Sequence, residues 1–236
     1  MTPILSVDSI VGKLQAANAR RAEALRGYRG QRHYHLDYHG LFGSHSADIW
    51  VEASYTAPDK KNFKVLSESG SGLLINRVLL KLLSSEAEAQ LDKNRKALEV
   101  TPANYEFSLD GVQHDADGDF YVLNVKPRSK SKYLYRGKIW VDAKDFAIAR
   151  MSGEPDKNPS IWISSTQIEY RWAGKGEFWL PMRNRSVTHV RMGGQAVLTI
   201  DYSDYQITAA DSFPKSQRSA QSVTLPAPSS VSADPP

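Results

Sequence analysis

Three histidines and an aspartate alternate along one stretch of the chain, where they could bind a metal ion. His33, His35, Asp37 and His39 are each separated by one residue, so an extended strand would place their side chains on one face. His33 and His35 could share one ion, with Asp37 or His39 as a third ligand. A straight strand nevertheless spreads the four positions too far apart for all to reach one ion, and no companion motif occurs elsewhere. We predict no metal site and no cofactor, and we keep a metal-dependent enzyme using this strand as an alternative.

A basic segment without acidic residues lies between Asp119 and Asp142. Such charges can attract an anionic lipid surface or an acidic patch on a partner protein. Together with Tyr133 and Tyr135 they could also bind nucleic acid, but a solvated hairpin loop is the commoner role, and we predict no nucleic-acid partner. The candidate docking residues are Lys126, Arg128, Lys130, Lys132 and Arg136.

The composition excludes several kinds of chemistry. The 236 residues include no cysteine, so disulfides, thiol nucleophiles, iron–sulfur clusters and cysteine-type zinc sites are excluded. We find neither paired carboxylates in a cleft motif nor a Ser-His-Asp signature, and we predict a binding protein without catalytic residues, not an enzyme. No apolar run approaches the roughly 20 residues needed to span a bilayer. The first residues lack the charged and apolar parts of a signal peptide, as in a cytoplasmic protein or a mature, processed form.

Period-two alternation predicts a large antiparallel sheet. Three strands precede residue 66 and seven follow residue 101, joined by short turns that favour pairing between consecutive strands. Ahead of them, the spacing predicts a helix over residues 8–26, with Asp8 as its cap and Gly27 as its stop. The densely apolar residues 73–83 predict a buried helical insertion after the third strand. The fold class is therefore α+β and mainly β.

One face of the first three strands is apolar, and so is the insertion. These side chains could pack as a core, as most such faces do, or line a cavity. After the last strand, residues 212–236 are rich in Ser and Pro, so we expect a disordered tail behind a single domain of residues 1–211. The apolar set is Tyr34, Leu36, Tyr38, Ile49, Val51, Tyr55, Phe63 and Val65 from the strands, and Leu74, Val78 and Leu82 from the insertion.

Three hairpin motifs carry a resemblance to a known family. They are residues 135–148 (YRGKIWVDAKDFAI), 176–181 (GEFWLP) and 198–205 (LTIDYSDY). Together they resemble bacterial outer-membrane lipoprotein-sorting proteins, relatives of the lipoprotein carrier LolA in the LolA/LolB/RseB superfamily. The resemblance implies an incomplete, half-open antiparallel β-barrel, with an N-terminal helix and a helical lid over a hydrophobic cavity. It also implies that the apolar set lines this cavity and binds acyl chains there.

The resemblance further implies a function and a location. We expect a periplasmic, monomeric carrier that sequesters the acyl chains of a lipid or lipoprotein, in lipoprotein sorting to the outer membrane. An envelope protein or an anionic membrane surface is expected as its docking partner. The alternative is an envelope lipid-sensing or protein-interaction module of the same fold without transport.

Overall fold

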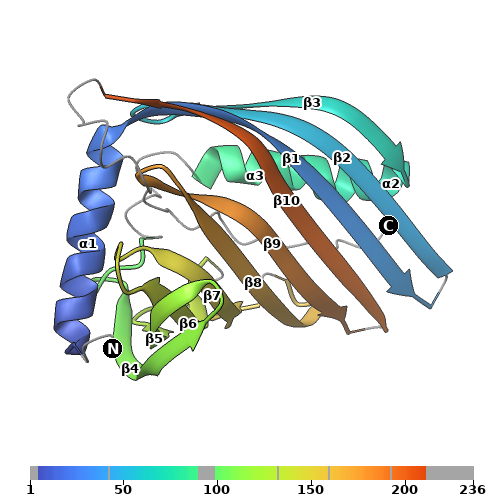
Figure 1. Ribbon diagram of the computed structural model, residues 1–236. Helices are drawn as coiled ribbons and strands as arrows, with labels where there is room; N and C mark the ends of the chain where they lie inside the picture. The colour runs from blue at the N-terminus through green and yellow to red at the C-terminus, as the bar shows by residue number, and fades with distance from the viewer. Residues whose placement is uncertain are drawn as a thin grey trace.

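A computed structural model describes residues 5–41, 43–89, 99–131, 133–158, 160–191 and 193–210 (Figure 1). In these ranges the chain forms one antiparallel sheet, an N-terminal helix and a helical insertion. The helical elements are α1 (Val7–Ala24), α2 (Gly72–Leu74), the π-helical turn η1 (Ile75–Leu79) and α3 (Leu80–Ala89). The strands are β1 (Leu25–Gly40), β2 (Gly43–Thr56), β3 (Lys60–Gly70), β4 (Tyr105–Asp115), β5 (Gly118–Pro127), β6 (Tyr135–Asp142), β7 (Ile148–Pro155), β8 (Ile163–Lys175), β9 (Phe178–Val190) and β10 (Gly194–Ala209).

The described strands follow the order β3-β2-β1-β10-β9-β8-β7-β6-β5-β4 in a single open, curved sheet (Figure 1). Every pairing except one is a hairpin between consecutive strands, as the short turns predict. The exception is β1 with β10, whose register runs from Leu25 opposite Ala209 to Gly40 opposite Gly194. This pairing places β3 and β4 at the two edges. The predicted half-open sheet with a helix before it and an insertion after the third strand is thus confirmed.

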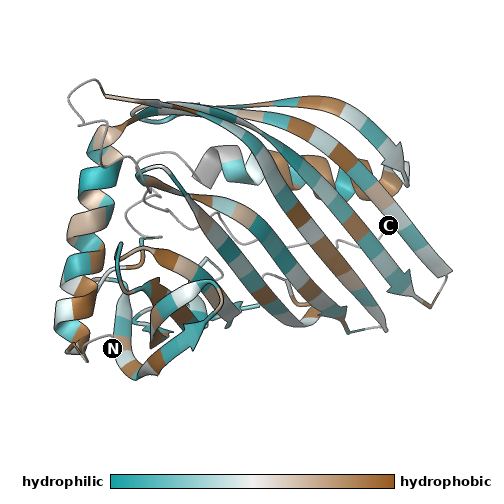
Figure 2. Cartoon of the chain, viewed as in Figure 1, coloured by the Kyte–Doolittle hydropathy of each residue, from teal (hydrophilic) through white to brown (hydrophobic). Residues whose placement is uncertain are grey.

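Two helical segments bury different halves of the inner face. Helix α1 packs on β4 to β8, where Ile10 and Leu14 join a cluster that includes Ile139 and Tyr170. The insertion packs on β1, β2 and β10, whose alternating hydropathy is visible along each strand in Figure 2. Each strand turns one set of alternate side chains towards a helix. The sheet therefore has two main cores side by side rather than one.

The boundaries of α1 differ from the prediction. Ser6, not Asp8, caps the helix, because its hydroxyl accepts a hydrogen bond from the backbone N–H of Ser9 at 3.3 Å. The helix ends at Ala24, two residues earlier than predicted, because Leu25 already has an extended backbone and pairs with β10. The predicted tail, residues 212–236, lies outside the described residues.

A buried arginine joins α1 to the turn between β6 and β7. The guanidinium of Arg21 donates to the backbone oxygen of Phe146 at 3.2 Å and to that of Asp145. Burial lowers the pKa of Arg21 to about 10, although Asp145 acts in the opposite direction. Helix α1 is therefore held by bonds to neutral backbone groups as well as by apolar packing.

Gly153 is required by the close approach of β6 and β7. It lies opposite Gly137, and a Cβ added to it would meet the backbone oxygen of Arg136 at 2.2 Å. We expect Gly153→Ala to lower the free energy of unfolding by about 1–3 kcal/mol, because the strands must separate. Gly12→Ala is the control, since a Cβ there meets nothing within 4 Å and α1 should gain about 0.5–1 kcal/mol. Urea denaturation measures both, and an unchanged Gly153→Ala midpoint would contradict the strand spacing.

Candidate functional site

The helical insertion lies along the inner face of β1, β2 and β10 (Figure 1). We call residues 72–86, which form α2, η1 and most of α3, the lid. Ser71 begins it, because its hydroxyl accepts a hydrogen bond from the N–H of Leu74. Beneath the lid, the buried side chains of the sheet are Tyr34, Leu36, Ala47, Ile49, Val51, Ala196, Leu198, Ile200 and Tyr202.

A π-helical turn lies within the lid. The N–H of Leu80 donates to the oxygen of Ile75, five residues earlier, so one extra residue enters this turn. An uninterrupted α-helix would align Leu74, Val78 and Leu82, as the sequence predicts. The inserted residue lets Leu74 share the buried face with Ile75, Leu79 and Leu83, while Val78 and Leu82 are only partly buried. Val78 and Leu82, which the sequence places among the cavity residues, therefore lie at the side of the buried face, packed against the same cluster.

The structure brings nine of the eleven predicted cavity residues into one cluster. Five of them are buried in it: Tyr34, Leu36, Ile49, Val51 and Leu74. Another four are partly buried against it: Tyr38, Phe63, Val78 and Leu82. Tyr55 stacks on Tyr28 in a separate small cluster, and Val65 is 37% exposed because β3 is an edge strand.

The lid and the inner face are packed against each other in this structure. Leu79 and Ile49 are both 0% exposed. Two hollows of about 190 and 240 Å³ lie elsewhere, one beside Arg29 and Glu52, the other beside Trp140 and Arg150. The nine clustered residues therefore pack together beneath the closed lid.

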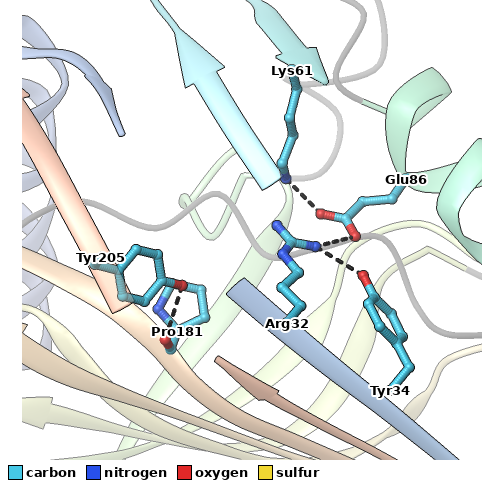
Figure 3. A network of polar contacts seen from close by, with 6 residues as sticks. All are labelled: Arg32, Tyr34, Lys61, Glu86, Pro181 and Tyr205. Atoms are coloured by element: carbon cyan, nitrogen blue, oxygen red, sulfur yellow. Dashed lines mark hydrogen bonds and ion pairs between the residues drawn. The ribbon is translucent and has the colours of Figure 1, made fainter. Parts of the chain in front are cut away.

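A buried cluster of charges joins the lid to the sheet (Figure 3). Nη1 of Arg32 on β1 donates to Oε2 of Glu86 on α3 at 2.7 Å, and to the hydroxyl of Tyr34 at 3.1 Å. Nζ of Lys61 on β3 donates to Oε1 of the same glutamate at 2.5 Å. The side chains of Arg32 and Glu86 are only 5% and 8% exposed. One carboxylate of the lid thus binds two cations of the sheet.

Aromatic rings and opposite charges stabilise this cluster away from water. The guanidinium of Arg32 lies 5.1 Å from the ring centre of Phe63 and 5.0 Å from that of Tyr202. Burial raises the pKa of Glu86, but Arg32 and Lys61 lower it more strongly, to about 2. Burial likewise lowers the pKa of Arg32, and Glu86 raises it well above its ordinary value. Arg32 and Glu86 therefore form an ionised pair at neutral pH.

Sequence reasoning missed these three residues, although two of them left a signal. Arg32 stands two residues before Tyr34, on the face that turned out to be apolar, so it is a charge in a buried stripe. Glu86 follows Leu83 by three residues and continues the buried face of the lid. A charge inside each of two apolar stripes indicates a buried pair. Lys61 had no such signal, because β3 is mostly exposed.

The candidate docking residues are spread along the opposite half of the molecule. Lys132 lies outside the described residues. The other four each lie within 4 Å of a carboxylate, so surface ion pairs offset part of their positive charge. Docking through them stays a prediction. The pairs are Lys126 and Arg128 with Glu106, Lys130 with Asp156, and Arg136 with Glu154.

The histidine strand forms a hydrogen-bonded cluster on the outer face. Nε2 of His33 and Nδ1 of His35 both lie 2.7 Å from Oδ1 of Asp48, and His35 also bonds to Asp37 at 3.0 Å. The ring of His33 stacks on Trp50. Within the described ranges, no group of three or more His, Cys, Asp or Glu side chains is arranged to hold a metal ion.

No protein-family model and no curated protein sequence matches the chain. Among solved structures, it is similar to a domain described as an outer membrane lipoprotein-sorting protein from Vibrio parahaemolyticus, at 11% identity and a TM-score of 0.43, over 88% of this chain and 94% of that one. A DUF1329 family protein from Desulfovibrio piger has 13% identity and a TM-score of 0.42, over 90% and 97%. A LolA superfamily protein from Nitrosomonas europaea has 14% identity and a TM-score of 0.33, again over 90% and 97%.

The order of elements in this chain is a helix, three strands, a helical insertion and seven strands along an open sheet. The open antiparallel sheet with an N-terminal helix and a helical insertion, expected from the sequence, is thereby confirmed. Among the described helices, none is both long enough and apolar enough to cross a membrane.

The buried face of the lid can be tested by shortening single side chains to alanine. We expect Leu79→Ala to lower the free energy of unfolding by about 2–5 kcal/mol, because its side chain is fully buried. Val78→Ala should cost less, and Leu73→Ala, at a position 62% exposed, should stay within about 0.5 kcal/mol. Denaturant titration measures all three. An effect of Val78→Ala as large as that of Leu79→Ala would contradict the buried face of the lid described above.

The ionised carboxyl of Glu86 predicts an acid-dependent stability. Its pKa falls from the ordinary 4.5 to about 2 in the fold, so its contribution is complete above the ordinary value and is lost as the pH falls towards 2. We expect the melting temperature to drop over this range more steeply in the native protein than in Glu86→Gln. Calorimetry at successive pH values measures both slopes. The exposed Glu106→Gln is the control and should keep the native slope; equal slopes for Glu86→Gln and the native protein would refute the assignment.

Proposed function

We propose that the protein binds the acyl chains of a lipid or lipoprotein on the inner face of β1, β2 and β10, after the lid has moved away. The observation that carries this proposal is the contact between lid and sheet. Leu79 and Leu83 of a short helical segment cover Leu36, Ile49 and their neighbours without any covalent or strand connection to them. An acyl chain offers the same kind of apolar surface and could replace the lid there.

The energetics of the lid favour such an exchange. Each buried CH₂ group of an acyl chain contributes about 0.8 kcal/mol, so a long chain can compensate for the lost contacts of Leu79 and Leu83. The π-helical turn is a form that is rare in proteins and common near functional sites. The buried pair of Arg32 and Glu86 adds little net stability, because removing two charges from water offsets much of their attraction. Opening the lid exposes Leu79 and Leu83 and separates Arg32 from Glu86, so we expect a bound acyl chain to stabilise the open form.

This binding mode suits a periplasmic carrier in lipoprotein sorting, whose cargo is held by its acyl chains. A second function, a lipid-responsive module that binds another envelope protein, is favoured by the hollow of about 240 Å³ on the other half of the sheet. There Arg150 stacks on Trp140 at 3.8 Å beside Met182, which is 45% exposed. Arg, Trp and Met are enriched in protein interfaces. Transfer of bound lipid to acceptor vesicles is expected of the carrier and not of the module.

Binding of monolaurin, an uncharged single-chain lipid, tests the proposal. Below its micellar concentration, native mass spectrometry should show a complex, and hydrogen exchange should rise in residues 72–86 but not in α1. Leu79→Ala should bind more tightly than the native protein, because a weaker lid leaves more protein open. Leu73→Ala, the exposed control, should bind as the native protein does. No complex, or a complex without faster exchange in the lid, would contradict binding beneath it.

A further inference from the structure

The charge cluster under the lid contains more positive than negative charge. Arg32 and Lys61 share the single carboxylate of Glu86, so the three groups keep a net charge of one positive. In the described part of the chain, no other carboxylate lies within ion-pair distance of either cation. Burying an unbalanced charge is costly, and proteins usually place one only where a counter-charge is bound.

The cations and the carboxylate belong to parts of the structure that separate when the lid moves. Arg32 lies on β1 and Lys61 on β3, while Glu86 lies on α3 (Figure 3). The rings of Phe63 and Tyr202, which flank the guanidinium, also belong to the sheet. Opening the lid thus removes the only carboxylate of the cluster and leaves two cations held in place by their own strands.

These two cations stand at one end of the apolar inner face. Arg32 donates to the hydroxyl of Tyr34, the first residue of the apolar stripe of β1. The stripe continues to Tyr38. Because each strand residue adds about 3.3 Å, the distance along β1 from Arg32 to Tyr38 is about 20 Å. An amphipathic molecule lying along β1 could therefore place an anion at Arg32 and its chain over Leu36.

We infer that Arg32 and Lys61 form the binding site for the anionic head group of the acyl ligand, and that Glu86 occupies this site in place of the ligand while the lid is closed. The inference rests on the proposed function and adds the ligand's chemistry, which is a long acyl or alkyl chain ending in a carboxylate or phosphate. The incoming anion takes the hydrogen bonds that Glu86 gives up, so opening the lid leaves neither cation unpaired.

Matched twelve-carbon ligands test this inference by isothermal titration. Laurate and dodecyl phosphate should each bind the native protein about tenfold or more tightly than monolaurin, since hydrogen bonds between charged groups are the strong ones. Lys61→Met should reduce this preference several-fold, and it leaves Arg32 and Glu86 as a balanced pair that supports folding. Lys60→Met, at the exposed neighbouring position, should keep the native preference. Comparing laurate with dodecyl phosphate identifies which head group the site prefers.

Glu86→Gln separates the role of the lid from that of the cations. The variant removes the carboxylate that holds the lid closed and keeps both cations. All three ligands should therefore bind more tightly by a similar factor, and the preference for anions should be retained. Equal affinity for laurate and monolaurin in the native protein would overturn the inference and leave the proposed function intact. So would a preference unchanged in Lys61→Met, or a Glu86→Gln variant that loses laurate binding alone. Failure of all three ligands to bind would overturn the proposed function itself.

Discussion

The inner face of the open sheet is apolar along both of its halves, and neither half is covered by the sheet itself. A closed barrel or a second sheet would bury such a face against other strands. In the described part of the chain, helices cover both halves of this face, and each is attached to the sheet in a different way. Helix α1 leads directly into β1, and Arg21 fixes it to the turn at Phe146. The lid follows the edge strand β3 and packs on the half of the face formed by β1, β2 and β10.

The two attachments differ in their chemistry. Arg21 binds backbone oxygens that cannot leave without unfolding the turn between β6 and β7. Arg32 binds a side chain, Glu86, on the very element that it holds in place. A buried ion pair is a weak source of net stability but is selective for position, because each misplaced charge is left unpaired. The lid is therefore held in a defined position by an interaction that another anion can replace.

Local patterns in the sequence were enough to predict most of the fold. Period-two alternation identified the strands, and the apolar run of residues 73–83 identified the insertion, because both depend on neighbouring residues. The π-helical turn at Ile75 escaped this reasoning, since the apolar residues are so dense that either register buries several leucines. The pairing of Arg32 with Glu86 also escaped it, because 54 residues separate them and only the folded sheet brings them together.

The pairing of β1 with β10 has a consequence for the order in which the molecule can form. Tyr38 lies opposite Ala196, so β1 has no partner on that side until the long segment between these two residues has been synthesised. Hairpins such as β4–β5 and β8–β9 need only local contacts and can form early, whereas distant strand pairs form slowly. During that interval, β1 is an exposed edge next to an apolar face, which is a hazard for aggregation. The half of the molecule that carries the lid is thus expected to be completed after the local hairpins have formed.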